Sequence, residues 1–473
     1  MQSLSASSNS SYRVTNPATG AVVESFTAAT DTEVEAALAS AHEGFGSWRQ
    51  RSTQERAAIV KRIGQLFTEK AEILGRIITE EMGKPLSQAV GEARFCTEIF
   101  DYFADNGEKL LADQEIDTAK SGRAVIQRRP VGPLLGIMPW NYPYYQVARF
   151  AAPNLVLGNT IVLKHAESCP RSALAIKEIM DEAGLPDGVY NNLFATHEQI
   201  AVIISDPRVQ GVSLTGSERA GAIIGQLAGK NLKKAVLELG GSDPYVVLDT
   251  DDVKAEAAAA WRMRLHNMGQ ACNSNKRIVV MDEIYDEFID ALVQLARGLK
   301  PGDPTVDEDS TYAPMSSREA AETLNAQVME AVAKGATLHA GGTLVDGRAA
   351  YYAPAVLTGV TAEMEAYSQE LFGPVAVVYR ARSEQEALEL ANDTAFGLGA
   401  AVFSTDPERA RNFAEKFEVG MANVNVPAAQ GAEFPFGGVK RSGFGRELGP
   451  LGMEEFVNKR LLYIHPARTA TLA

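Results

Sequence analysis

Hydrophobic positions change their spacing along the chain, and the change predicts two kinds of structure. Residues 31–115 carry apolar side chains at helical spacing, as in DTEVEAALASAHEGFGSW, for which Asp31 is the expected N-cap. From about residue 134, short apolar runs alternate with amphipathic helical segments. We expect strands in TIVLK (160–164), GVYNNLFA, VQGVSLTG and KKAVLELGG, with a helix between each pair. This alternation predicts an α/β fold with a parallel, doubly wound sheet.

A second series of strands and helices begins after residue 240. It contains the strand-like runs PYVVLD (244–249), RIVVMD (277–282), YYAPAVLTGV, PVAVVYR and GAAVFSTD. We expect a separate sheet with its own helices, and we place a domain boundary near residue 240. Two further runs, AVIQRRP (124–130) and KRLLYIHP (459–466), fit neither series. Because exposed edge strands invite pairing with another chain, these runs predict an arm that pairs between subunits.

Composition narrows the class of protein. The 473 residues carry a formal net charge of −15 and contain no long basic run, which argues against nucleic-acid binding. The polar start MQSLSASSNSSYRV is interpreted as a loose tail and not as a signal peptide, and no apolar stretch is long enough to cross a bilayer. Three cysteines, far apart and odd in number, form neither a disulfide framework nor a metal motif. We therefore expect a cytoplasmic protein without a bound metal.

One cysteine lies in a sequence context that favours chemistry. Cys272 stands in NMGQACNSNKR, among small and amide-bearing residues. Packing in the core is the commoner role of a lone cysteine. A thiolate is nevertheless a strong nucleophile, and the polar neighbours of this thiol place it where a substrate can reach it.

Two further side chains are candidates for acid–base and electrostatic roles. Glu238 ends an apolar strand in VLELGGSDP, at the strand end where α/β sheets place their ligands, and could accept a proton. Its alternative is a solvated loop carboxylate. Asn141, in GIMPWNYPYYQVARF, follows Trp140 in a turn bounded by prolines, where its amide could donate to a developing oxyanion. Its alternative is an ordinary turn residue.

A glycine-containing turn predicts a phosphate site. In SLTGSERAG, Gly216 and Ser217 follow a strand and precede a helix that contains Gly221. Free N–H groups at a helix N-terminus bind phosphate well, although Gly-Ser is also an ordinary helix cap.

Taken together, these stretches resemble the NAD(P)-dependent aldehyde dehydrogenase superfamily. The motifs PWN, GSxxxG, ELGG and GQAC occur in the family's order, accompanied by NPATG (16–20), VLKHAE (162–167), ELFGPV (370–375), NDTAFGLGAAVF (392–403) and PFGGVKRSGFGRE (435–447). With the strand series, the resemblance implies a Rossmann-type cofactor domain, an α/β catalytic domain and a small β oligomerisation arm. We expect the cofactor domain to comprise residues 1–116 and 131–240, the catalytic domain residues 241–445, and the arm residues 117–130 and 446–473.

The resemblance also implies a mechanism. The Cys272 thiolate attacks the aldehyde carbon, and the oxyanion is held by the Asn141 amide and the backbone N–H of Cys272. The thiohemiacetal passes a hydride to the nicotinamide, and the resulting thioester is hydrolysed by a water that Glu238 deprotonates. Charge that builds on oxygen is met by preorganised donors in a dry site.

Cofactor contacts follow from the same resemblance. They are expected at the turn after the first strand, at the ribose and phosphate subsites, and beside the nicotinamide: Met138, Pro139, Trp140, Lys164, Glu167, Gly216, Ser217, Gly221, Leu239, Glu370 and Phe372. A carboxylate at 167 accepts hydrogen bonds from a ribose 2′-OH and repels a 2′-phosphate, which favours NAD over NADP. Lys164 leaves NADP as the alternative cofactor.

The substrate is expected to be a small aldehyde, with succinate semialdehyde as the leading candidate. Arg149 occupies a position that faces the substrate tunnel in the family, where it could grip a distal carboxylate. Its alternative is packing against a neighbouring helix. Some succinate-semialdehyde enzymes carry a second Arg where this chain has His266, which could act as a cation or a hydrogen-bond donor. Gln430 stands in VPAAQGAEF, where relatives can present a serine.

Several other functions compete with this interpretation. The enzyme could use another aliphatic aldehyde or semialdehyde, or transfer the acyl group to coenzyme A, although Glu238 argues against the latter. A cysteine hydrolase would not need the predicted cofactor residues, and a non-catalytic NAD-binding protein would not need Cys272, Glu238 and Asn141 together. The arm-like strands predict a homodimer or homotetramer.

Overall fold

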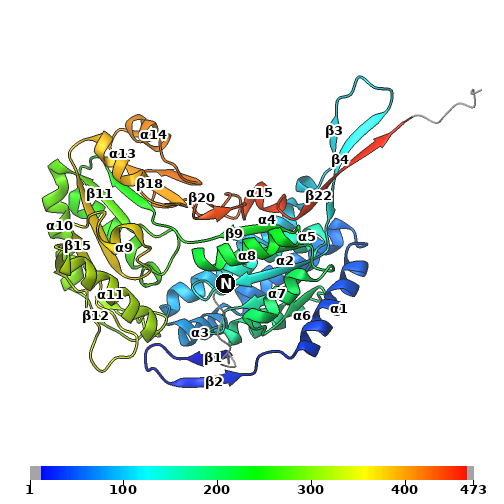
Figure 1. Ribbon diagram of the computed structural model, residues 1–473, viewed down its shortest axis with the longest axis horizontal. Coiled ribbons are helices and arrows are strands. Elements are labelled where there is room, and N and C mark those ends of the chain that lie inside the picture. Colours follow the sequence, from blue (N-terminus) through cyan, green and yellow to red (C-terminus); the bar gives the residue numbers. More distant parts are fainter. Residues whose placement is uncertain (1–11, 466–473) are drawn as a thin grey trace, which may run out of the picture.

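The structure is a computed structural model that describes residues 12–465 (Figure 1). Residues 1–11 of the predicted tail and residues 466–473 of the predicted arm lie outside the described residues. The described chain begins with a hairpin that the hydrophobic pattern did not reveal, formed by β1 (Tyr12–Thr15) and β2 (Val22–Phe26).

The following region is helical, as predicted. The first helix is capped by Thr30, and not by Asp31 as we expected. The Thr30 side chain accepts a hydrogen bond from the backbone N–H of Glu33, and the Glu33 carboxylate accepts one from the backbone N–H of Thr30. A second capping box, made by Ser52 and Glu55, opens the next helix. The four helices are α1 (Asp31–Trp48), α2 (Thr53–Glu69), α3 (Ala71–Met82) and α4 (Leu86–Leu110).

A six-stranded sheet follows in the middle of the chain. Its order is β21-β9-β8-β5-β6-β7, and β5 to β9 are mutually parallel. The chain order reverses between β5 and β8, which is the position where doubly wound sheets bind dinucleotides. The strands are β5 (Pro133–Met138), β6 (Thr160–His165), β7 (Tyr190–Asn192), β8 (Gly211–Thr215), β9 (Lys234–Glu238) and β21 (Gly443–Phe444). The connecting helices are α5 (Tyr145–Leu157), α6 (Pro170–Glu182), α7 (His197–Ser205) and α8 (Glu218–Lys230).

A seven-stranded sheet is formed by the second series, as expected. Its order is β14-β15-β16-β11-β10-β18-β19, parallel except for β14. The strands are β10 (Pro244–Val247), β11 (Arg277–Met281), β14 (Thr337–Ala340), β15 (Ala355–Thr358), β16 (Val375–Ala381), β18 (Gly399–Phe403) and β19 (Met421–Val424). The helices are α9 (Val253–Leu265), η1 (His266–Gly269), α10 (Asp282–Arg297), α11 (Arg318–Ala333), α12 (Glu365–Ser368), α13 (Glu384–Asn392) and α14 (Pro407–Ala414).

The two runs predicted to form an arm pair with each other. They form β4 (Arg123–Pro130) and β22 (Val457–Ile464), which are antiparallel over eight residue pairs, with β3 (Gln114–Ile116) on the other side of β4. This three-stranded sheet projects from the rest of the chain (Figure 1). The remaining short elements are β12 (Lys300–Pro301), β13 (Thr311–Tyr312), β17 (Phe396–Gly397), β20 (Val439–Lys440) and α15 (Gly449–Met453).

The packing of the two larger sheets explains why the elements form as they do. Strands β6, β8 and β10 are buried along their whole length, as expected for parallel strands covered on both faces. Helix α5 is buried on every side and packs between the six-stranded sheet and helices α2 and α4. The α/β prediction is confirmed. None of the helices within residues 12–465 combines the length and the apolar character that a bilayer crossing needs.

Candidate functional site

The predicted site residues lie at the edge of the six-stranded sheet where its parallel strands end. Strand β5 ends at Met138 and leads into the turn that carries Asn141, β8 ends one residue before Gly216, and β9 ends at Glu238. The carboxyl ends of parallel strands share one edge of the sheet, so segments far apart in the sequence come together there. Cys272 comes from the other sheet, in the turn that precedes β11.

The turn before Cys272 has an unusual backbone. Asn267 and Met268 both adopt left-handed conformations, with φ of 50° and 52°. Such values are tolerated by Asn but strained for a long side chain such as Met. The strain is held by contacts around the turn, and it is a feature that hydrophobic spacing does not reveal.

Asn141 is tied directly to the cysteine turn. Its side-chain Nδ2 donates to the carbonyl of Gln270 at 3.0 Å, and the Nδ2 of Asn267 donates to the carbonyl of Asn141 at 2.9 Å. The Asn141 side chain is buried, with 5% exposure. An amide Nδ2 carries two hydrogens, so one stays available for an oxygen near Cys272.

Glu238 is buried without a hydrogen-bond partner. It is 2% exposed, and neither carboxylate oxygen has a partner among residues 12–465. Burial, and then the negative charge of Glu447, raise the pKa of the Glu238 carboxyl well above its usual range, against the opposing effect of Arg149. A carboxyl with a raised pKa is a stronger base when ionised, which is a property of groups that exchange protons in catalysis.

Cys272 is half-buried, and its environment keeps the thiol protonated. Removal from water raises the pKa of Cys272 to about 12, although the positive charges of Arg149 and Lys276 act in the opposite direction. A thiol with this pKa needs a nearby base before it can attack a carbonyl carbon. Arg149 interacts electrostatically with both Cys272 and Glu238, which places these two groups around the same guanidinium.

Close backbone packing brings the ELGG segment onto the cysteine turn. A side-chain carbon on Gly241 would collide with the carbonyl oxygen of Cys272, so only glycine fits at this position. The Cys272 carbonyl also accepts from Lys276 Nζ at 2.7 Å. Glu238 lies three residues before Gly241 in the same segment. The structure therefore brings together the segments that carry Cys272, Glu238 and Asn141.

The residues predicted for the adenosine ribose form a charged cluster. Lys164 Nζ pairs with Glu167 Oε1 at 2.6 Å, and His197 Nε2 lies 3.4 Å from the same oxygen. Burial would raise the pKa of Glu167, but the charge and hydrogen bond of Lys164 outweigh it, so the pKa is lowered. The cluster offers a permanent carboxylate acceptor for a sugar hydroxyl, with two basic groups beside it.

The predicted phosphate site has the required backbone geometry. Ser217 caps α8, and its hydroxyl accepts from the N–H of Ala220 at 3.3 Å. A side chain on Gly221 would collide with Leu239, so this glycine lets α8 lie directly on the strand end. The positive end of α8 therefore faces the shared edge of the sheet, where a diphosphate would be stabilised.

The residues predicted to lie beside the nicotinamide are also close to one another. Glu370 Oε1 accepts from the N–H of Gly241 at 3.1 Å and pairs with Lys276 at 3.0 Å. The Trp140 and Phe372 rings meet edge to face, with centroids 5.8 Å apart. A carboxylate, a helix N-terminus and a ribose-binding cluster along one edge fit a dinucleotide, so the residues present match the cofactor that the sequence predicts.

The same arrangement of elements occurs across one family. The model of the aldehyde dehydrogenase family matches residues 4–462. The chain belongs to the aldehyde dehydrogenase family. It is an NAD(P)-dependent oxidoreductase that converts aldehydes to acids, as predicted.

Two curated proteins and one solved structure are similar to this chain over nearly its whole length. The chain is 49% identical to succinate-semialdehyde dehydrogenase (NADP(+)) of Deinococcus radiodurans over 97% of this chain and 95% of that protein. It is 42% identical to succinate-semialdehyde dehydrogenase (NADP(+)) 1 of Mycobacterium bovis over 95% and 98% of the two chains. The crystal structure of succinic semialdehyde dehydrogenase from Streptococcus pyogenes in complex with NADP+ matches with a TM-score of 0.93 at 40% identity, covering 96% of this chain and 100% of that one. The prediction of an aldehyde-dehydrogenase-like fold is confirmed.

Arg149, which we predicted to face the substrate tunnel, is already paired within this aldehyde dehydrogenase. Its side chain is 1% exposed, and Nε lies 2.8 Å from Glu447 Oε2. The guanidinium also stacks on the Phe436 and Tyr145 rings, 4.2 and 4.7 Å from their centroids. The role of Arg149 as an anchor for a substrate carboxylate stays a prediction, and its charge is balanced within the chain.

His266 and Gln430 lie in different surroundings. The His266 ring stacks on Tyr142, and its Nδ1 lies 3.1 Å from the Tyr142 hydroxyl. Burial, with a contribution from Lys84, lowers the pKa of His266 to about 4, so the ring is neutral near pH 7 and acts there through hydrogen bonds. Gln430 is exposed, in the loop after β19.

Two charged residues of this site were missed by sequence reasoning. Lys276, four residues after the cysteine, links the Cys272 carbonyl to Glu370. Glu447, in the motif GFGRE, faces Arg149. Lys276 could have been found from its spacing to Cys272, whereas nothing in the local sequence pairs Glu447 with a residue almost 300 positions away.

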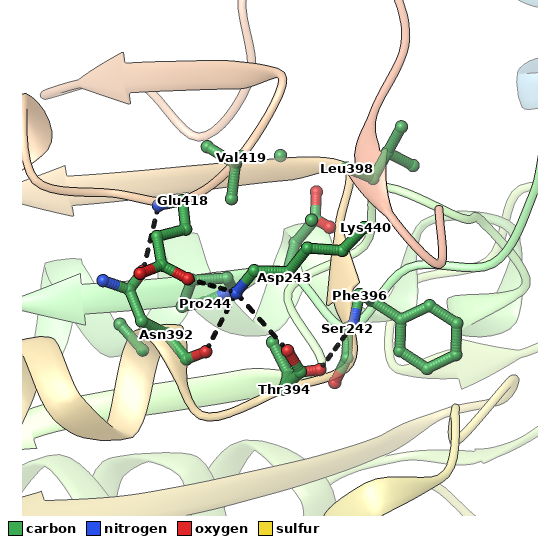
Figure 2. Close-up of a pocket in the computed structure, with 13 residues that line it drawn as sticks. Ser242, Asp243, Pro244, Asn392, Thr394, Phe396, Leu398, Glu418, Val419 and Lys440 are labelled. Carbon is green, nitrogen blue, oxygen red and sulfur yellow. Dashed lines mark hydrogen bonds and ion pairs between the residues drawn. The ribbon is translucent and has the colours of Figure 1, made fainter. Parts of the chain in front are cut away.

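A separate crevice lies beside the amino end of β10 and contains none of the predicted site residues (Figure 2). Lys440 fills part of it: its Nζ lies 2.6 Å from Glu418 Oε2 and 3.2 Å from the carbonyl of Asn392. Because this ammonium is already held by chain oxygens, the crevice has a local structural explanation and is not a second aldehyde site.

Proposed function

We propose that this aldehyde dehydrogenase oxidises succinate semialdehyde to succinate through a thiohemiacetal and a thioester on Cys272. The observation that carries the proposal is the packing of Gly241 on the Cys272 carbonyl, because Gly241 belongs to the segment that contains Glu238. The substrate is supported by the names of the similar proteins, which are succinate-semialdehyde dehydrogenases.

The first step needs the thiol proton to leave. Glu238 in its ionised form accepts the proton of Cys272, and the sulfur then forms a bond to the aldehyde carbon. The carbonyl π-electrons move to oxygen, where the free hydrogen of Asn141 Nδ2 and the backbone N–H of Cys272 donate to the developing charge. Donors fixed before the reaction need no reorganisation when the charge appears.

Oxidation and hydrolysis then complete the turnover. NAD(P), when bound, supplies the hydride acceptor that turns the thiohemiacetal into a thioester. Ser217, the Lys164–Glu167 pair and Glu370 would hold it. Glu238 first releases the thiol proton to solvent and then takes a proton from water as the water oxygen attacks the thioester carbon. The C–S bond breaks, and the acid leaves while Cys272 regains a proton.

NAD is proposed as the preferred cofactor, with NADP as a second cofactor. Glu167 supports NAD because a carboxylate accepts from a 2′-OH and repels a 2′-phosphate. Two similar proteins are named for NADP(+), and Lys164 and His197 beside Glu167 could balance a phosphate. The ratio of kcat/KM for NAD and NADP measures this preference, and a ratio below one would contradict it.

A screen of short aldehydes tests the proposed activity. We expect NADH absorbance to grow with succinate semialdehyde without coenzyme A, and kcat/KM to exceed that for a neutral aldehyde of similar length. Cys272→Ala should abolish turnover and leave cofactor binding close to wild type. Retained turnover in that variant would contradict the nucleophile. Turnover only with coenzyme A would favour acyl transfer, and equal kcat/KM for charged and neutral aldehydes would favour another aliphatic substrate.

The organisation of the enzyme is part of the proposal. We divide it into a cofactor domain (1–116 with 131–240), a catalytic domain (241–445) and the arm, and we expect a cytoplasmic homodimer or homotetramer. The outer strand of the arm, β22, carries a largely exposed run of side chains, which supports pairing with a second copy. A monomeric mass by light scattering at micromolar concentration would contradict the assembly.

A further inference from the structure

One face of helix α4 contacts both turns of the proposed site. Gln88 and Glu92 are four residues apart in this helix, so their side chains lie on the same side, one above the other. Gln88 reaches the turn before Cys272, and Glu92 reaches the turn after Asn141. Neither residue has a role in the mechanism proposed above.

Glu92 holds the segment that follows Asn141. Its Oε1 accepts from the backbone N–H groups of Tyr144 and Tyr145, at 2.9 and 3.2 Å, where α5 begins. Its Oε2 pairs with the buried ammonium of Lys84. A carboxylate at a helix N-terminus interacts favourably with the free N–H groups and the dipole there. Glu92 therefore fixes the start of α5 against α4, three residues from Asn141.

Gln88 holds the strained turn that precedes Cys272. Its Oε1 accepts from the backbone N–H of Asn267 at 2.8 Å. Asn267 in turn donates through Nδ2 to the carbonyls of Asn141 and Gln270, at 2.9 and 3.3 Å. A single amide of α4 thus anchors the residue that bridges the two turns.

Lys84 and Tyr142 form a further connection between the same two turns. The Lys84 ammonium lies 3.7 Å from the centroid of the Tyr142 ring, and the Tyr142 hydroxyl meets His266, the first residue of the cysteine turn. Helix α4 and the lysine before it therefore hold the two turns by three routes, two of which are joined by the Lys84–Glu92 pair.

We propose that Gln88 and Glu92 are positioning residues that set the spacing between the Asn141 side chain and Cys272. This spacing lets the Asn141 amide and the backbone N–H of Cys272 both donate to the oxyanion of the thiohemiacetal. This inference rests on the proposed function, because Asn141 and Cys272 must carry the reaction. Reaction rates depend steeply on such spacing: a displacement of about 1 Å can cost on the order of 100-fold.

Gln88 is the better residue to test, because it is half-buried and uncharged, whereas removal of Glu92 would leave the Lys84 ammonium buried without its partner. Gln88→Leu removes the acceptor at similar size, and Gln88→Glu keeps an oxygen in place. Gln294→Leu, on the exposed face of α10, is the matched control.

We expect Gln88→Leu to lower kcat for aldehyde oxidation roughly 10-fold or more, with the KM for NAD unchanged. Gln88→Glu should restore most of kcat, and Gln294→Leu should have none of these effects. The rate of Cys272 alkylation by iodoacetamide should stay close to wild type, because that reaction forms no oxyanion. Equal losses in oxidation and alkylation would overturn the inference and indicate a general structural role.

A double-mutant cycle with Asn141→Ala gives the sharper test. If Gln88 acts through the Asn141 amide, Gln88→Leu should lower kcat little further once that amide is absent. Full additivity of the two losses, or a wild-type kcat for Gln88→Leu, would overturn the inference. Failure of the proposed function is distinguishable, because it would appear as retained turnover in Cys272→Ala.

Discussion

Two carboxylates at the same sheet edge have opposite properties. Glu238 ends strand β9, and Glu167 lies two residues beyond the end of strand β6. Glu238 is buried, with no hydrogen-bond partner for either oxygen within the described residues, and its pKa is raised by burial and by Glu447. Glu167 is half-buried, pairs with Lys164 at 2.6 Å, and its pKa is lowered.

The difference shows how the environment assigns a role to one residue type. A carboxyl without partners in a dry site has a raised pKa and is a stronger base than an exposed carboxylate, which suits proton transfer. A carboxylate beside an ammonium stays ionised and serves as a fixed acceptor, which suits recognition of a sugar hydroxyl. Both environments occur at one edge of the sheet. Strand β9 ends next to the cysteine turn, where Glu238 is buried, whereas β6 leads into a segment next to the exposed His197, where Glu167 lies.

The largest effect should come from exchanging the two carboxylates for amides. Glu238→Gln removes the base and should lower kcat by about 10²- to 10⁴-fold. Glu167→Gln should keep kcat within a few-fold, because its proposed contact is to the cofactor ribose and not to the reacting atoms. Steady-state kinetics at saturating NAD compares the two variants, and similar losses of kcat in both would remove the distinction.

The next effect concerns the pH dependence of kcat/KM. Its acid limb reports the loss of one proton from the Cys272–Glu238 pair, and the raised pKa of Glu238 places that limb above pH 4.5. Glu447→Gln removes a negative charge that raises this pKa, so the limb should move to lower pH. Arg149→Met removes a positive charge that lowers it, so the limb should move to higher pH.

The two shifts should have opposite signs, because the two variants remove opposite charges. Arg149→Lys, which keeps the charge, is the matched control and should shift the limb less than Arg149→Met. Shifts of the same sign in Glu447→Gln and Arg149→Met would contradict the assignment of the limb.

Much of this comparison could be predicted from the sequence. The strands that end at Met138, Thr215 and Glu238 are visible as apolar runs followed by Gly, Pro or polar residues, and parallel pairing then brings their ends together. The motif ELGG also marks a close backbone approach, which the structure shows at Gly241.

The remaining features depend on contacts that leave no local signal. The pairing of Arg149 with Glu447, and the hydrogen bond from Asn267 to Gln88, join residues hundreds of positions apart or on unrelated elements. The antiparallel pairing of strand β21 with β9 at Glu238 likewise joins segments about 200 positions apart. Two-residue strands are too short to give a periodic pattern.

A smaller effect is expected on cofactor choice. Glu167→Gln removes the charge that repels a 2′-phosphate and leaves Lys164 without its partner, so the NADP/NAD ratio of kcat/KM should rise, by roughly 10-fold. His197→Gln is the companion variant and should lower the same ratio by a few-fold, since His197 lies beside Glu167. An unchanged ratio in Glu167→Gln would show that cofactor choice is made elsewhere.

The central claim is that Cys272 carries the acyl group and Glu238 releases it. Mass spectrometry of Glu238→Gln, quenched during turnover with succinate semialdehyde and NAD, tests this claim most directly. In this variant the Cys272 proton leaves only slowly, to bulk water, and the thioester that then forms has no base to activate its hydrolysis. The account therefore predicts a mass gain of one succinyl group on the peptide that contains Cys272, and none in Cys272→Ala/Glu238→Gln. An unmodified Cys272 peptide alongside ongoing NADH production, or the adduct on Cys96 or Cys169, would contradict it.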